Sequence, residues 1–122
     1  MAQVDYISRG GKRIMMVDLS HLSDYGSVPG LADLAIQLAH SNQPESVLAL
    51  IDLSGTKINE VVISSLKKMS ANNGPYMKAI AFVGFGRFKS TAMSLLLLTT
   101  RRRNHKVIRD RESALRWLCE QE

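Results

Sequence analysis

The residues best suited to chemistry lie in a short polar turn that follows a strongly apolar segment. The candidate residues of this turn are Asp52, Ser54, Gly55, Thr56 and Lys57. In open α/β sheets, ligands bind at the carboxyl ends of the strands, where a following helix N-terminus also favours an anion. We therefore expect an anion-binding or partner-binding edge here, with Ser54 and Thr56 as candidate phosphorylation sites. A purely structural interpretation stays open, in which both hydroxyls cap the helix and Asp52 bonds the turn backbone.

A glycine loop at positions 83–90 is predicted to join the same edge. The residues that it would contribute are Gly84, Gly86, Arg87 and Lys89. Its spacing matches neither a P-loop nor a dinucleotide-binding fingerprint, because Lys89 occupies the third glycine position. We expect a tight turn between a strand and a helix that adds cations to the edge, rather than a nucleotide site.

Catalysis has little support in the sequence. His21, His40 and His105 are predicted on a loop, a helix end and a strand start, without the spacing of metal ligands. The single cysteine, Cys119, has no neighbouring base in the sequence and is interpreted as a packing residue of a late helix. Asp18 ends a strand as Asp52 does, but the adjacent acidic pair of a phosphoacceptor receiver domain is missing. We expect no catalytic residue, no metal and no cofactor.

The segment from Phe88 to Thr100 is predicted to form an unusual helix. The candidate interface residues are Phe88, Leu95, Leu96, Leu97 and Leu98, and the basic patch that follows is Arg101, Arg102 and Arg103. Four consecutive leucines place apolar side chains around the whole helix, which one buried stripe does not explain. The helix is therefore either fully buried, covered by a second copy or another protein, or in contact with lipid. The basic patch either complements the helix dipole or contacts phosphate or an anionic membrane.

Length and composition indicate one small globular domain. The chain has 122 residues, 45% hydrophobic and 22% charged, with a net charge of +5. The start of the sequence does not resemble a signal peptide, and the apolar stretch at 92–98 is too short to cross a bilayer. One cysteine fits a reducing compartment, so we expect a cytoplasmic protein.

Hydrophobic periodicity predicts an alternation of strands and helices in the order ββαβαβαβα. The predicted strands are 4–8, 12–19, 46–53, 77–85 and 105–108, and the predicted helices are 31–39, 58–71, 88–100 and a last one that Asp110 caps. The glycine pair Gly10-Gly11 predicts an antiparallel hairpin between the first two strands. The rest of the order implies a mostly parallel sheet of about five strands with four helices.

The order of elements resembles the STAS fold of bacterial anti-sigma-factor antagonists, and more closely the SpoIIAA-like group. The segments that carry the resemblance are Ile51 to Gly55, Asn73 to Ala79, Val83-Gly84, Leu95 to Leu98, and Ala114 to Leu118. The family's best-known members look to be switched by phosphorylation of a serine in an Asp-Ser-Ser-Gly pattern. Laid on that pattern, Ser54 is the acceptor; counted from the strand, the position falls at Ile58 or Asn59.

The resemblance implies a non-catalytic regulatory or protein-interaction domain, with phosphorylation near positions 52–57 as its candidate switch. The partner would be another protein or a second copy. An alternative function is carriage or sensing of a lipid or small apolar ligand by the helix at 88–100. A third is weak nucleic-acid binding, which the net charge permits but the few aromatic residues make less favourable.

Overall fold

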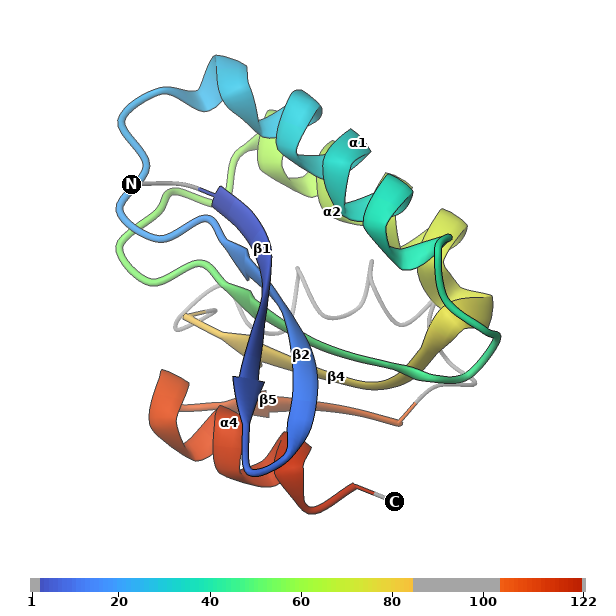
Figure 1. The fold of residues 1–122 in the computed structure, drawn as a ribbon. Coiled ribbons are helices and arrows are strands. Elements are labelled where there is room, and N and C mark those ends of the chain that lie inside the picture. Colours follow the sequence, from blue (N-terminus) through green and yellow to red (C-terminus); the bar gives the residue numbers. More distant parts are fainter. Residues whose placement is uncertain (1–2, 85–103, 122) are drawn as a thin grey trace.

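The sheet agrees with the prediction. The computed structural model describes residues 3–84 and 104–121, which contain a five-stranded sheet in the order β1-β2-β3-β4-β5 (Figure 1). Its strands are β1 (Gln3–Arg9), β2 (Lys12–Asp18), β3 (Val47–Asp52), β4 (Met77–Val83) and β5 (Asn104–Ile108). Strand β1 is antiparallel to β2, and every other neighbouring pair is parallel. The mostly parallel sheet with an N-terminal antiparallel hairpin is therefore confirmed.

The hairpin turn follows from two adjacent glycines. Gly10 and Gly11 have φ values of +59° and +78°, and Arg9 pairs with Lys12 on either side of them. A two-residue turn with two positive φ values matches the right-handed twist of the strands, and glycine adopts it without a steric penalty.

Three α-helices lie within the described residues. They are α1 (Val28–Ala39), α2 (Glu60–Asn73) and α4 (Arg111–Cys119), with short 3-10 turns at Tyr25–Ser27 and Gly74–Tyr76. The prediction of four helices is thus not met there, because the helix expected from Phe88 to Thr100 falls outside the described residues. No helix in the described ranges is long and apolar enough to cross a membrane.

The start of α1 corrects the predicted boundary. The helix begins at Val28 instead of Leu31, and a proline occupies its first turn. Pro29 is compatible with this position because the first N–H groups of a helix have no partner inside it. Periodicity alone placed the start at the first repeating apolar residue and therefore missed this turn.

The helices cover the sheet on two sides. Helices α1 and α2 lie together on one face and α4 lies on the other (Figure 1). Alternating residues of β2 supply both cores: Met15 and Val17 pack with α1 and α2, whereas Ile14 and Met16 pack with α4. Strand β3 is buried along its whole length, as expected for a central strand covered on both faces.

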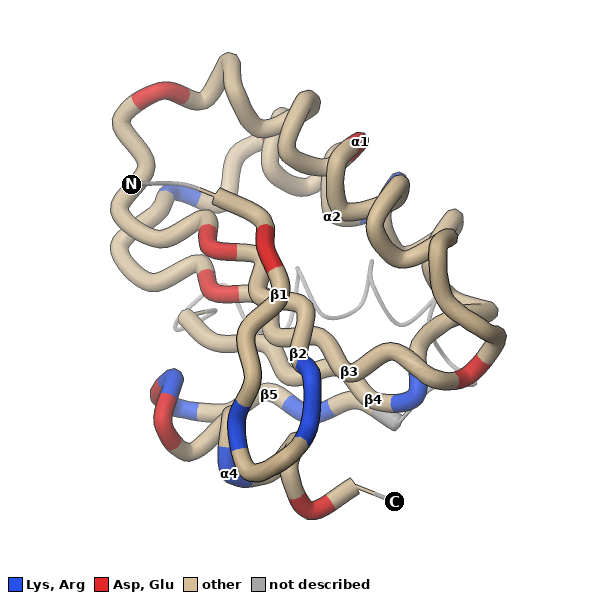
Figure 2. Tube along the Cα trace, in the orientation of Figure 1, with Lys and Arg blue, Asp and Glu red and all other residues tan. Residues whose placement is uncertain are grey.

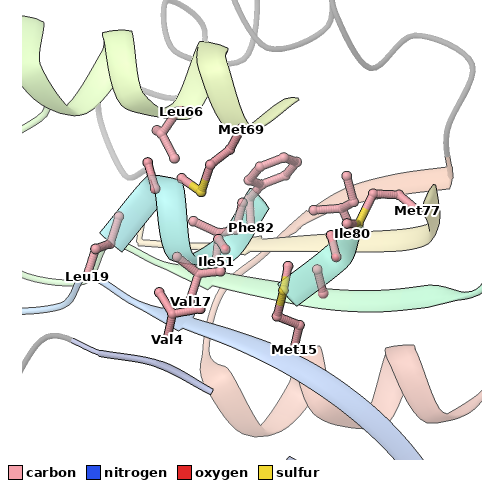
Figure 3. Packing of buried hydrophobic residues seen from close by; sticks show 14 of the residues in the cluster. Val4, Met15, Val17, Leu19, Ile51, Leu66, Met69, Met77, Ile80 and Phe82 are labelled. Atoms are coloured by element: carbon pink, nitrogen blue, oxygen red, sulfur yellow. The ribbon is translucent and has the colours of Figure 1, made fainter. Parts of the chain in front are cut away.

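The larger core lies between the sheet and the two paired helices. Figure 3 shows Leu66 and Met69 of α2 directed toward Phe82 and Ile51 of the sheet. Phe82 is fully buried, so the central strands are fixed in register by close packing as well as by their hydrogen bonds. This rigid platform positions the ends of β2, β3 and β4.

Candidate functional site

Two identical Asp-Leu-Ser segments lie side by side at the carboxyl edge of the sheet. Asp18 ends β2, Asp52 ends β3, and the two are direct partners in the parallel register. The Oδ1 atom of Asp18 accepts a hydrogen bond from the backbone N–H of Ser20 at 3.1 Å, and Asp52 Oδ1 accepts one from Ser54 at 2.9 Å. Each aspartate therefore closes its own turn, which confirms the predicted bond from Asp52 to the turn backbone.

One arginine joins the two aspartates. Arg111 donates two hydrogen bonds to Asp52 Oδ2, from Nε at 2.9 Å and from Nη2 at 2.6 Å. The same Nη2 lies 3.1 Å from Asp18 Oδ1. The side chain of Asp52 is only 5% exposed and that of Asp18 15%, whereas that of Arg111 is 41% exposed. We call Asp18, Asp52 and Arg111 the carboxylate clamp.

The pKa values of Asp18 and Arg111 both shift toward the charged form. Burial raises the pKa of Asp18, but hydrogen bonds from Ser20 and the charge of Arg111 outweigh it and leave that pKa below its usual value. Burial acts to lower the pKa of Arg111, and the contacts with Asp52 and Asp18 raise it overall. Asp18 and Asp52 therefore share one guanidinium.

The position of Arg111 in its helix is informative. Arg111 is the first residue of α4, immediately after the N-cap Asp110, whose carboxylate accepts a hydrogen bond from the backbone of Ser113 at 2.8 Å. This confirms the predicted cap. A cation in the first turn opposes the helix dipole, so the contacts with Asp18 and buried Asp52 are what favour an arginine there.

Thr56 is part of the scaffold of the turn. Its hydroxyl donates to the backbone carbonyl of Leu19 at 2.5 Å and accepts from the backbone N–H of Leu22 at 3.0 Å. These two hydrogen bonds connect the segment after β2 to the segment after β3. Thr56 itself is buried. The interpretation of Thr56 as a helix cap is wrong, because Asn59 caps α2 through Val62.

Gly84 packs directly on this turn. It has a φ of +88°, and a Cβ atom at that position would lie 2.3 Å from the backbone nitrogen of Ser54. Gly55 has a φ of +71°, and a Cβ atom at that position would lie 2.3 Å from Nδ1 of the His21 ring. Gly84 thus lies against the turn at 52–57, and glycine is favoured at both positions because both have a positive φ.

The exposed part of the turn is small and polar. Ser54 is half-buried, Gly55 and Lys57 are exposed, and the backbone N–H of Lys57 donates to the hydroxyl of Tyr25 at 2.9 Å. The remaining predicted residues lie outside the described residues; they are Gly86, Arg87, Phe88, Lys89, Leu95, Leu96, Leu97, Leu98, Arg101, Arg102 and Arg103. The lipid-carrier prediction depends on this range and stays a prediction.

His40 and Cys119 make ordinary structural contacts. His40 Nε2 lies 2.9 Å from the carbonyl oxygen of Asn72, and its ring packs on Tyr76. The thiol of Cys119 donates to the carbonyl of Arg9 at 3.2 Å. In the part of the chain that the structure describes, no group of three or more histidine, cysteine or acidic side chains is placed to hold a metal ion.

The clamp was missed as a unit by sequence reasoning. Asp18 was noticed only as a strand end, and Arg111 only as one of several basic residues near the C-terminus. Two signals point to it in retrospect: the repeated Asp-Leu-Ser at the ends of neighbouring strands, and an arginine in a helical position that disfavours cations.

The fold defined by this sheet and its two helix layers is SpoIIAA-like. A similar solved structure is that of an uncharacterised protein of the DUF3478 family from Shewanella loihica PV-4, which has a SpoIIAA-like fold. It is 22% identical in sequence, covers 98% of this chain and 96% of its own, and has a TM-score of 0.66. The sequence matches no protein-family model and no curated protein. The expected SpoIIAA-like fold is confirmed, and at this identity the likeness concerns the fold alone.

Proposed function

We propose that this chain is a non-catalytic regulatory domain that recognises another protein through the exposed turn Ser54–Lys57. The observation that carries the proposal is the construction of this turn. Buried Asp52 and Thr56 hold the backbone of the turn by hydrogen bonds. Ser54, which lies between them, is half-buried, and Lys57, which follows them, is exposed. A rigidly held polar loop on a packed platform is a common form of recognition surface.

Of the two candidate phosphorylation sites, Ser54 is the one that the geometry favours. The Thr56 hydroxyl is buried and already makes two hydrogen bonds, so a kinase would have to open the turn to reach it. Ser54 is half-buried, and its hydroxyl bonds to no other described residue. We therefore assign the proposed switch to Ser54.

A phosphate on Ser54 would act on the carboxylate clamp. It would add a charge of about −1.5 to −2 next to Asp52, which already shares its arginine with a second carboxylate. The phosphate would repel both aspartates and compete for the exposed part of Arg111, because arginine binds phosphate in a bidentate manner. Such competition would loosen the start of α4 and change the surface that a partner meets.

Chemical crosslinking tests the recognition surface. Proteins in intact source cells are crosslinked with an amine-reactive reagent, and the peptides joined to this chain are identified by mass spectrometry. We expect crosslinks to one partner protein from Lys57. Lys67, an exposed lysine of α2, is the matched control. Lys57→Glu should weaken co-purification of that partner and Lys67→Glu should not; equal behaviour of the two variants would refute the proposed surface.

Phosphopeptide mapping tests the switch separately. The chain purified from the same cells should carry a phosphate on Ser54, and Ser54→Ala should remove it while Thr56→Ser leaves it in place. An unmodified Ser54 under every growth condition would remove the switch and leave the crosslinking result standing.

A further inference from the structure

A basic cavity lies at the other end of the sheet, away from the carboxylate clamp. It has a volume of about 230 Å³ and lies where β2, β3 and β4 begin. Its lining residues are Tyr6, Lys12, Arg13, Asn42, Ser46, Val47, Leu48 and Lys78. Figure 2 shows lysine and arginine positions gathered at this end of the sheet, near the β1–β2 hairpin, and acidic positions at the carboxyl ends of β2 and β3.

The cations of this cavity differ from those that form ion pairs elsewhere in the described part of the chain. Arg9 and Lys68 form ion pairs with carboxylates on the surface. Lys12, Arg13 and Lys78 line the cavity, and no carboxylate lines it among the described residues. The ammonium of Lys12 donates to the backbone carbonyl of Gln121, so Arg13 and Lys78 are the cations that an anion would meet. Positive charges brought together without an acidic neighbour repel one another, so their convergence favours an anion between them.

Arg13 is held in place by neutral contacts. Its guanidinium lies 4.0 Å from the centre of the Tyr6 ring, and Nη2 donates to Asn42 Oδ1 at 2.8 Å. The amide of Asn42 in turn donates to the Tyr6 hydroxyl at 2.7 Å. These contacts orient the arginine without neutralising it and use few of its five N–H donors, so the rest remain for a ligand.

Lys78 enters the cavity because the sheet is irregular at this point. Val47 pairs with Met77 and Leu48 pairs with Ala79, which leaves Lys78 without a partner in β3. An extra residue of this kind turns a side chain away from the regular alternation of the strand. Ser46 also lines the cavity, and its hydroxyl donates to the backbone carbonyl of Gln43 at 2.7 Å.

We infer that this cavity binds a phosphate monoester. A dianionic phosphate matches the two cations Arg13 and Lys78, and an arginine held by an aromatic ring presents a planar pair of donors to phosphate oxygens. The volume is below the range of about 300 to 1,000 Å³ that is typical of drug-sized ligands, so the cavity fits a phosphate with a small polar body. The site is independent of the proposed recognition turn.

Nuclear magnetic resonance titration with glycerol 3-phosphate tests the inference. We expect saturable shifts of the backbone amides of Arg13, Ser46 and Lys78, with a Kd of about 1 mM or tighter. Arg13→Ala and Lys78→Met should each weaken binding by about tenfold or more, because each removes a hydrogen bond to a charged group. Lys67→Ala is the control for general charge and should bind as the wild type does.

A second arm separates the two sources of a phosphate monoester. Vesicles of phosphatidylcholine with phosphatidic acid present the same group on a lipid. If the wild-type protein co-sediments with these vesicles and Arg13→Ala does not, the source of the phosphate is a lipid headgroup. Lys78→Met keeps the aliphatic stem, so it tests the site even if Arg13→Ala fails to fold. The inference is overturned if neither probe binds saturably, or if the variants at positions 13 and 78 bind as tightly as Lys67→Ala.

Discussion

Replacement of Arg111 by alanine should destabilise the protein far more than replacement of its neighbour Arg109. Arg111 is the only described cation that contacts Asp18 and the buried Asp52. Arg109 forms an ion pair with Asp110 at 3.5 Å, but its side chain is 93% exposed. The two arginines lie two positions apart, so their comparison separates the carboxylate clamp from charge in general.

The size of the effect follows from the burial of the partners. Removing one member of a fully buried pair costs about 3 to 5 kcal/mol, because it leaves an uncompensated charge in the interior. Asp52 is nearly inaccessible, but Arg111 is 41% exposed, so water enters part of the space that the guanidinium leaves. We therefore expect Arg111→Ala to lower the free energy of unfolding by about 2 to 3 kcal/mol, and Arg109→Ala by less than about 0.5 kcal/mol.

Urea denaturation followed by circular dichroism measures both values, and thermal melting should show a Tm decrease of about 8 °C for Arg111→Ala. Asp52→Asn supplies the second side of a double-mutant cycle, since its amide oxygen can still accept from Ser54 N–H. Arg111→Ala should cost about 1 to 2 kcal/mol less in that background. Equal losses of unfolding free energy for Arg111→Ala and Arg109→Ala would refute the reasoning. So would a double-mutant cycle in which the effects of Arg111→Ala and Asp52→Asn simply add.

Three further perturbations test the construction of the same edge. Gly84→Ala should cost about 2 kcal/mol or more, measured by urea denaturation, because its φ is +88° and its Cβ would meet Ser54; a neutral result would contradict the close approach. Thr56→Val should cost about 2 kcal/mol, since two backbone groups lose their partner, whereas Thr56→Ser should cost less. The lowered pKa of Asp18 means that its contribution to stability is complete above the ordinary value near 3.8 and is lost as pH falls through the lowered one. Unfolding free energies measured from pH 6 to pH 2 should therefore fall less steeply in Asp18→Asn than in the wild type; identical slopes would contradict this.

The fold could be predicted from the sequence because its strands are short and have clear hydrophobic patterns. The continuous apolar run 47–51 identifies a strand that is buried on both faces, and the pair Gly10-Gly11 fixes the hairpin and its register. Boundaries were less accurate where chain stiffness and capping decide them. Pro29 starts α1 earlier than its apolar pattern indicates, and Asn59 caps α2 through Val62.

The candidate site was predicted only in part, because its main contact is not local. The turn at Asp52 was found from the general rule for the ends of parallel strands. The guanidinium that neutralises it comes from Arg111, a separation of 59 residues, and no local pattern encodes such a contact. The basic cavity was missed for a similar reason, since Arg13 and Lys78 meet only after β2 and β4 take their places beside β3.

The two ends of the sheet differ in whether their cations are paired with carboxylates, so the two proposals can be tested separately. At the carboxyl edge, any anion near Ser54 must compete with Asp18 and Asp52 for one arginine that is already bound. At the amino end, Arg13 and Lys78 have no carboxylate partner among the described residues, so an anion there meets no such competition. Salt should therefore weaken phosphate binding at the amino end, where the charges are accessible, and leave the buried contact between Asp52 and Arg111 largely intact. If added salt changed the stability effect of clamp substitutions as much as it changed the binding effect of cavity substitutions, the two ends would be electrostatically coupled.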